Sequence, residues 1–148
     1  MLDLLEQFSG SDFFKLTIAF LLALPVAYDR EQSTRIMGLR TFPLVAIATC
    51  GYVLIGQTFI EASDGGAQAR ILQGLVAGIG FIGGGAILKK DDRVLGTASA
   101  ASIWTTGAIG IAVAYARYDI ALFLMAANFV VLRWLTPLKH YVPQFKEE

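Results

Sequence analysis

The most informative stretch of the sequence is Ile71–Leu88, ILQGLVAGIGFIGGGAIL. It runs eighteen residues without a charge, and six of them are glycine. A bilayer is spanned by about 18 or more uncharged apolar residues, whereas a core helix of a soluble protein is rarely so long and so bare. Glycine disfavours a helix in water, but in lipid it lets helix backbones approach closely. The stretch therefore predicts a transmembrane helix.

The glycines of this stretch fall on two faces when residues are spaced at about 100° around a helix. The two faces are Gly74, Gly78 and Gly85 on one side, and Gly80, Gly83 and Gly84 on the other. A helix that is smooth on two sides packs neighbours on both, so we expect it at the centre of a bundle. The run Gly83–Gly85 is either a continuous smooth surface or a break that lines a site, and we favour the smooth surface.

Composition and charge spacing extend this prediction to the whole chain. Of its 148 residues, 55% are hydrophobic and 16% charged, against roughly 25% charged in a soluble domain. The uncharged intervals are Leu16–Tyr28, Thr41–Ile60, Ile71–Leu88, Val94–Ala116 and Ile120–Leu132. The first and last reach spanning length if Lys15 and Arg133 extend toward the interface. We predict an all-α integral membrane protein, a bundle of five transmembrane helices with short loops over residues 13–138.

The ends and connections of this bundle are short. Residues 1–12 either lie along the membrane interface or fray, and residues 139–148 form a short cytoplasmic tail. The segment Ala62–Ala69 is expected as an external turn broken by Gly65–Gly66. A tight turn at Arg117–Asp119 makes the last two helices antiparallel neighbours.

The basic residues predict an orientation. Nine Lys and Arg residues fall on the side of the 29–40 loop, the 89–93 loop and the C-terminus, and three fall on the other side. Positive charge favours the cytoplasmic side. We therefore expect the N-terminus outside and the C-terminus in the cytoplasm.

The densest polar cluster joins the first two spans, with Asp29, Arg30 and Glu31 followed by Arg40. Asp29 lies at the C-terminal end of a helix, where the helix dipole disfavours an anion, so it needs Arg30, Arg40 or a cation as partner. One interpretation is a solvated loop of anchoring charges. The other is an ion-pair network or a hard-cation site at the cytoplasmic mouth of the bundle, with Mg²⁺ as the ion that carboxylates suit.

Two further polar groups have alternative readings. Asp91 and Asp92 form either a charge-balanced turn or a pair that contacts Mg²⁺ through water. In the fourth span, a stripe of small residues forms either a tight helix–helix seam or the polar lining of a solute path. This stripe consists of Ser99, Ser102, Thr106 and Gly110. The seam is favoured because no ionisable residue occurs between Val94 and Ala116.

Several functional classes find no support in the residues. His140 is alone, Cys50 is the single cysteine, and no hydrolytic or redox set is present, so we expect neither an enzyme nor a cofactor. The Gly-rich stretch lies inside a hydrophobic span with no preceding strand, unlike a nucleotide loop. Formal net charge is zero, which gives no reason to expect nucleic acid.

Three stretches, in order, resemble the hydrophobic domain of the MgtC/SapB family of bacterial membrane proteins. They are Asp29-Arg30-Glu31, Gly38-Leu39-Arg40-Thr41, and Ala77–Leu88 followed by Ala100-Ala101-Ser102-Ile103-Trp104. Longer members of that family also carry a soluble C-terminal domain, so the resemblance is confined to the membrane part. It implies a protein of the bacterial cytoplasmic (inner) membrane, linked to magnesium homeostasis.

The best-known member of the family resembles a regulator that restrains the rotary ATP synthase through membrane contacts. We accordingly expect a regulator or partner subunit that acts through helix–helix contacts, with the lipid bilayer and a membrane protein as partners, and a homo-oligomer as a further assembly. The alternative is a Mg²⁺ or proton carrier or channel, with acidic residues at its cytoplasmic mouth.

Overall fold

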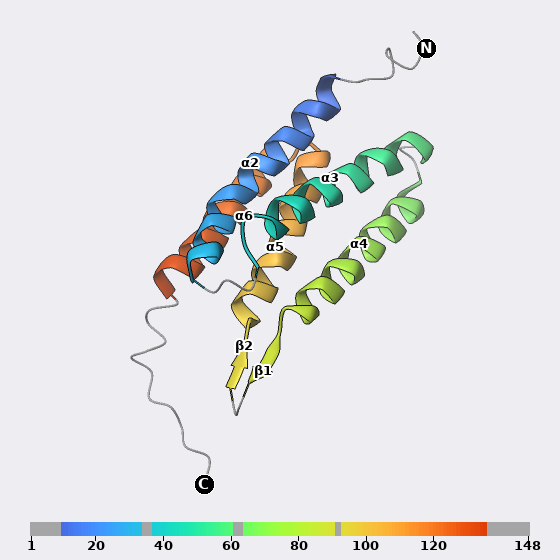
Figure 1. Ribbon diagram of the computed structural model, residues 1–148. Helices are drawn as coiled ribbons and strands as arrows, with labels where there is room; N and C mark the ends of the chain where they lie inside the picture. The colour runs from blue at the N-terminus through green and yellow to red at the C-terminus, as the bar shows by residue number, and fades with distance from the viewer. Residues whose placement is uncertain (1–9, 34–36, 61–63, 91–92, 136–148) are drawn as a thin grey trace.

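Five α-helices and one β-hairpin make up the part of the chain that the structure, a computed structural model, describes: residues 10–33, 37–60, 64–90 and 93–135 (Figure 1). In chain order these are α2 (Gly10–Ser33), α3 (Thr41–Phe59), α4 (Gly65–Gly85), β1 (Leu88–Lys90), β2 (Arg93–Leu95), α5 (Thr97–Ala114), α6 (Tyr118–Val130) and the π-helical turn η1 (Val131–Leu135). Successive helices alternate in direction, so the hairpin, the end of α2, the start of α3 and the end of η1 share one end of the bundle (Figure 1). We call this the hairpin end.

Four of the described helices are long and apolar enough to cross a membrane: α2, α3, α5, and α6 continued through η1. The expected class, an all-α multi-pass membrane protein, is confirmed. α4 has 21 residues, about 32 Å of helix, but its most apolar 18-residue stretch is less apolar than that of each of the other four. It ends at Gly85, which leaves apolar residues 86–88 outside the helix, and it includes Gln68 and Arg70.

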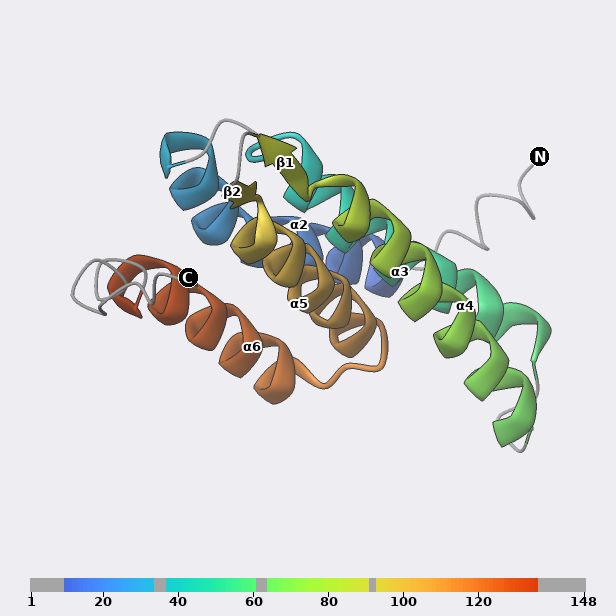
Figure 2. The ribbon, with the colours of Figure 1, turned by 90° about the horizontal axis from the view of Figure 1, so that it is seen from below.

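The central helix of the bundle is α5, and the expectation that the glycine-rich helix would be central is wrong. Figure 2 shows α5 between α4 and α6, and it also contacts α2 and α3. α5 buries ten of its 18 residues, whereas α4 buries only Ile79 and Gly83. The physical reason is side-chain size at the contacts. α5 meets its neighbours through small residues such as Ser102 and Gly110, whereas α4 exposes large residues such as Phe81 between its glycines.

The ends of α4 also differ from the expected turn and span. Gly65 and Gly66 form the first turn of α4 rather than a break, because Asp64 caps the helix by accepting a 2.8 Å hydrogen bond from the Ala67 amide. After Gly85 the chain forms the antiparallel hairpin, in which Leu88 pairs with Leu95. Gly96 then turns the chain into α5 with a φ of 86°, a left-handed conformation that glycine adopts without strain.

Some expected features fall outside the described residues. These are the tail at 139–148, the pair Asp91 and Asp92, and most of the interfacial segment at 1–12, of which Gly10–Asp12 opens α2.

The expected neighbours α5 and α6 do pack together, with a connection that leaves α5 after Ala114 and enters α6 at Tyr118.

The tightest approach in the core joins α3 and α5. A Cβ added to Gly110 would meet both the Thr49 hydroxyl and the Ala46 carbonyl oxygen. The Thr49 hydroxyl donates a 2.9 Å hydrogen bond to the Val45 carbonyl of its own helix. Around this crossing the core is built from small side chains that let α2, α3, α5 and α6 come close, among them Ala19, Ala23, Cys50, Ala112 and Ala121.

We expect Gly110→Ala to lower the free energy of unfolding by about 1–3 kcal/mol, the cost of overpacking a filled core. The added methyl group meets a backbone carbonyl, which cannot move unless α3 shifts. Gly74→Ala is the matched control, because nothing lies within 4 Å of its Cβ position. Loss of helical circular dichroism on titrating detergent micelles with SDS measures both. Equal stability of the two variants would contradict the close approach.

Candidate functional site

An ion pair lies at the hairpin end of α2. The Asp29 Oδ2 atom accepts hydrogen bonds from Arg30 Nη2 at 2.7 Å and from Arg30 Nε at 3.3 Å. Both side chains are nearly covered, with 11% of Asp29 and 3% of Arg30 exposed. Adjacent helical residues do not normally face each other, and the long Arg30 side chain closes this gap. The partner that Asp29 requires at a helix C-terminal end is thus its own neighbour.

Glu31 and Gly38 hold the end of α2 against the start of α3. The Glu31 Oε2 atom accepts a 3.0 Å hydrogen bond from the Leu39 amide. Gly38 lies directly beneath Glu31, so a Cβ there would collide with the Glu31 side chain and backbone. The Gly38 carbonyl accepts the amides of Thr41 and Phe42 at 3.1 and 3.2 Å, which satisfies donors in the first turn of α3. This contact therefore fixes how the chain enters α3.

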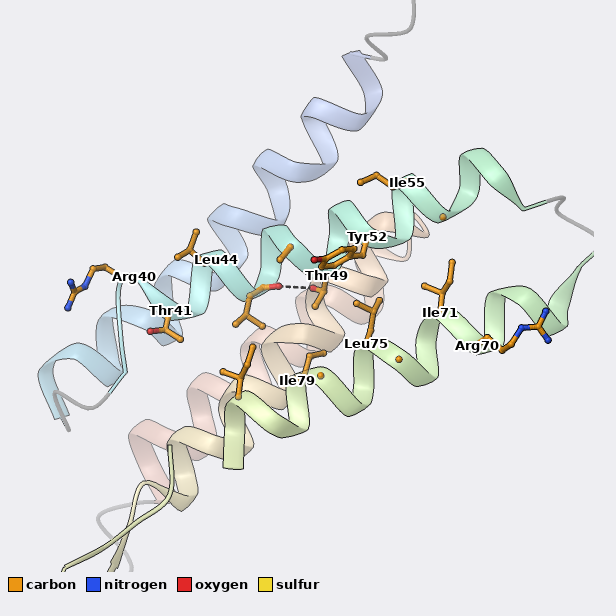
Figure 3. Close-up of a pocket in the computed structure, with 16 residues that line it drawn as sticks. Arg40, Thr41, Leu44, Thr49, Tyr52, Ile55, Arg70, Ile71, Leu75 and Ile79 are labelled. Atoms are coloured by element: carbon orange, nitrogen blue, oxygen red, sulfur yellow. Dashed lines mark hydrogen bonds between the residues drawn. The ribbon is translucent and has the colours of Figure 1, made fainter. Parts of the chain in front are cut away.

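Arg40 does not join the residues that the sequence groups with it. Its side chain is exposed and points away from the bundle (Figure 3), and no carboxylate of the described residues pairs with it. Asp29, Arg30 and Glu31 thus make local contacts, and Arg40 stands apart from them. Nor do three or more His, Cys, Asp or Glu side chains of the described residues come together.

The small-residue stripe of α5 is buried along its length. Ser102 donates a 2.9 Å hydrogen bond to Asn128 Oδ1 on α6, and Thr106 donates 2.8 Å to the Ser102 carbonyl. Gly110 abuts α3. The Ser99 hydroxyl, also buried, has no hydrogen-bond partner among the described residues. The stripe therefore lies between helices, with α6 on one side and α3 on the other.

Asn128 is the polar residue that sequence reasoning missed. It is 8% exposed, and its Nδ2 atom also donates to the Ser102 carbonyl at 3.4 Å. Its signal in the sequence was an amide side chain inside the uncharged interval Ile120–Leu132. A polar side chain at that depth requires a partner on another helix.

The six glycines of α4 from Gly74 to Gly85 have three different surroundings. Gly83 packs on α5, where its Cβ position is 3.2 Å from the Ala100 carbonyl oxygen. Gly74 and Gly78 line an apolar groove of about 840 Å³ between α3 and α4 (Figure 3). The others have open space at their Cβ positions and do not line the groove: Gly80, Gly84 and Gly85. α4 continues through Gly83–Gly85 without a break and ends there.

We expect Asp29→Asn to lower the free energy of unfolding by about 3 kcal/mol, because it weakens the charge-assisted hydrogen bonds that the buried Arg30 donates to this carboxylate. Asp119→Asn is the matched control. Asp119 pairs with Arg117 at 3.0 Å, but both side chains are mostly exposed, so its loss should change stability little. SDS titration of the purified variants compares them. If Asp29→Asn were as stable as Asp119→Asn, the buried pair would not contribute to the free energy of unfolding.

Curated relatives match most of this chain, and the matched region is only part of each relative's own length. Protein SrpB of Synechococcus elongatus is 32% identical over 122 residues, 74% of this chain and 66% of SrpB. Protein MgtC of Salmonella typhimurium is 33% identical over 117 residues, 79% of this chain and 48% of that protein. Protein MgtC of Brucella abortus is 34% identical over 93 residues, 63% of this chain and 38% of that protein. The chain thus spans about half the length of the curated relatives it matches.

A family model agrees with these relatives. The model described as the MgtC family matches residues 16–141, a range that includes the contacts at the hairpin end, the stripe and both helices of the groove. No solved structure matches the chain. The resemblance noted in the sequence is confirmed, and the chain belongs to the MgtC family.

Proposed function

We propose that this MgtC-family protein is a regulator or partner subunit of the bacterial cytoplasmic membrane, linked to magnesium homeostasis. It acts through helix–helix contacts, with no catalysis of its own. The observation that carries the proposal is the uncovered side of α4. A helix that is largely apolar and attached to its own bundle along one side offers its other side to a second membrane protein.

The outer flank of α4 is its exposed surface on the side away from the groove. It consists of Val76, Ala77, Gly80, Phe81 and Gly84, all of them exposed. Gly80 and Gly84 are four residues apart with open space above each, the spacing that lets a second helix approach closely in lipid. Phe81 is 85% exposed beside them and supplies apolar surface for packing. We infer that a transmembrane helix of the partner binds this flank.

We propose two candidate partners for this surface. One is a second copy of the chain, in which the outer flanks of two α4 helices face each other. The other is a membrane subunit of the rotary ATP synthase, in line with the regulator that the best-known family member resembles. The same flank serves either partner, so one set of variants tests both.

A carrier or channel remains the alternative function. It needs unpaired polar groups along a path through the membrane. Among the described residues, the Asp29 carboxylate is paired with Arg30, and Ser102 and Thr106 bond to Asn128 and to their own helix. Ser102 and Asn128 join two helices, and the Ser99 hydroxyl, which has no partner among the described residues, does not make a path through the membrane by itself, which supports the regulator over the carrier.

We further propose that the hairpin end faces the cytoplasm. The support is the charge count, nine basic residues against three, together with the alternating helices that bring the 29–40 segment and the hairpin to one end (Figure 1). Cytoplasmic loops carry the excess of Lys and Arg. The N-terminus is then outside and the C-terminus inside.

Gly80→Leu should reduce the recovery of a partner about tenfold, the effect of about 1.4 kcal/mol of lost binding. The bulky side chain prevents close approach of a second helix, while the open space at Gly80 leaves the monomer intact. Val76→Leu on the same flank is the control, since it replaces one exposed branched residue with another of similar size. Tagged protein is purified from native membranes and probed for untagged copies and ATP synthase membrane subunits. Wild-type recovery of both partners with Gly80→Leu would refute the proposal.

Cysteine labelling tests the orientation. In a Cys50→Ala background, which removes the single and buried cysteine, Arg117→Cys and Lys89→Cys place one thiol at each end of the bundle. A membrane-impermeant maleimide added to spheroplasts should label Arg117→Cys at once and Lys89→Cys only after lysis. The reverse pattern would place the hairpin end outside.

A further inference from the structure

The groove between α3 and α4 is open because the two helices diverge. They meet near Ile71, whose side chain contacts Gly56, and separate toward Arg40 (Figure 3). Beyond this meeting point α4 turns to α5 instead, with Ile79 against Gly107 and Gly83 against Ala100. The wedge that results has a volume of about 840 Å³.

The walls of the groove are apolar and reach the membrane-facing surface. Leu44 on α3 is 65% exposed and Ile82 on α4 is 40% exposed. Along α3 the lining runs from Arg40 to Gly56, about 24 Å at 1.5 Å per residue, against a hydrocarbon core of roughly 30 Å. A crevice of this kind in a bilayer is filled by hydrocarbon. One acyl chain, which covers about half of the core, extends from the Arg40 end to the level of Tyr52.

The wide end of the groove is positively charged. Arg40 lines it with its exposed side chain directed outward from the mouth (Figure 3), and it forms no ion pair among the described residues, although the Glu31 carboxylate is bound to the adjacent Leu39 amide. Thr41 lines the same end, and no described residue accepts a hydrogen bond from its hydroxyl. A guanidinium with a neighbouring hydroxyl is a donor set for phosphate. Basic pockets between transmembrane helices bind anionic headgroups in this way.

The narrow end of the groove is less suited to an anion. Arg70 lines it, but the Asp64 carboxylate is close by, since both side chains lie within 4 Å of the Cβ position of Gly66. That carboxylate lowers the positive potential around Arg70. The charge of the groove therefore favours a headgroup at Arg40.

We propose that this groove binds an anionic phospholipid. The phosphate lies at Arg40 and Thr41, and one acyl chain lies along Leu44, Ala48 and Gly78. This assigns a role to Arg40, which takes no part in the contacts of Asp29, Arg30 and Glu31. The lipid site and the outer flank are on different sides of α4, so the failure of one proposal would not contradict the other.

Native mass spectrometry of the full chain tests the site, with phosphatidylglycerol or phosphatidylcholine added to the detergent-purified protein. The protein should retain phosphatidylglycerol in preference to phosphatidylcholine. Arg40→Gln should weaken retention about tenfold, the loss of one charge-assisted hydrogen bond. Arg133→Gln is the control, because Arg133 is exposed at the same end but outside the groove. It should retain the lipid as the wild type does.

A second pair of variants tests the acyl-chain path without changing charge. Gly78→Leu fills the groove and should also weaken retention, whereas Gly80→Leu, on the outer flank, should not. Both positions have open space, so both variants should fold, and size-exclusion profiles check this. Wild-type retention by Arg40→Gln, equal loss in Arg133→Gln, or equal binding of phosphatidylcholine would overturn the proposal. So would a polypeptide that co-purifies in the groove and is lost with Gly78→Leu.

Discussion

The close approach of α3 and α5 at Gly110 is the constraint on which the rest of the bundle depends. α5 contacts four other helices, and the residues at its close contacts with α3, α4 and α6 are small, namely Gly110, Gly107 and Ser102. Close contact also brings Ser102 within hydrogen-bonding distance of Asn128 on α6. In lipid, where apolar burial does not drive helices together, such packing and such hydrogen bonds supply the association energy. The small residues of α5 therefore set both the shape and the stability of the protein.

The sequence predicts the fold class and most of the helices, because the length of an uncharged interval indicates whether a helix can cross a bilayer. It also predicts that Asp29 needs a partner. It does not predict which helix is central, because a glycine face shows where a neighbour can approach and not whether one does. Gly83 has a neighbour and Gly84 has none, although both lie in one run. The sequence also does not predict that α4 ends at Gly85. Residues 86–88 are as apolar as the helix before them, so the sequence does not show that the hairpin begins there.

The residues that carry the family resemblance between α2 and α3 divide into two groups by what they contact. Glu31 and Gly38 fix the connection between α2 and α3, while Asp29 and Arg30 neutralise each other at the end of α2. These are structural contacts, and their dependence on geometry explains why residue types alone left their role open. Arg40 faces outward from the same segment. The two surfaces of α4, the outer flank and the groove, are where the molecule meets other components of the membrane.

The modest hydropathy of α4 has a consequence for how the protein is made. Insertion from the translocon follows the apolar content of each segment, and an arginine weakens it. With eight glycines and Arg70, α4 partitions into lipid less readily than the helices around it. The hairpin joins it directly to α5, whose small surface receives Ile79 and Gly83. During synthesis α4 is therefore expected to settle in the bilayer only when α5 emerges, so that the two enter as a pair.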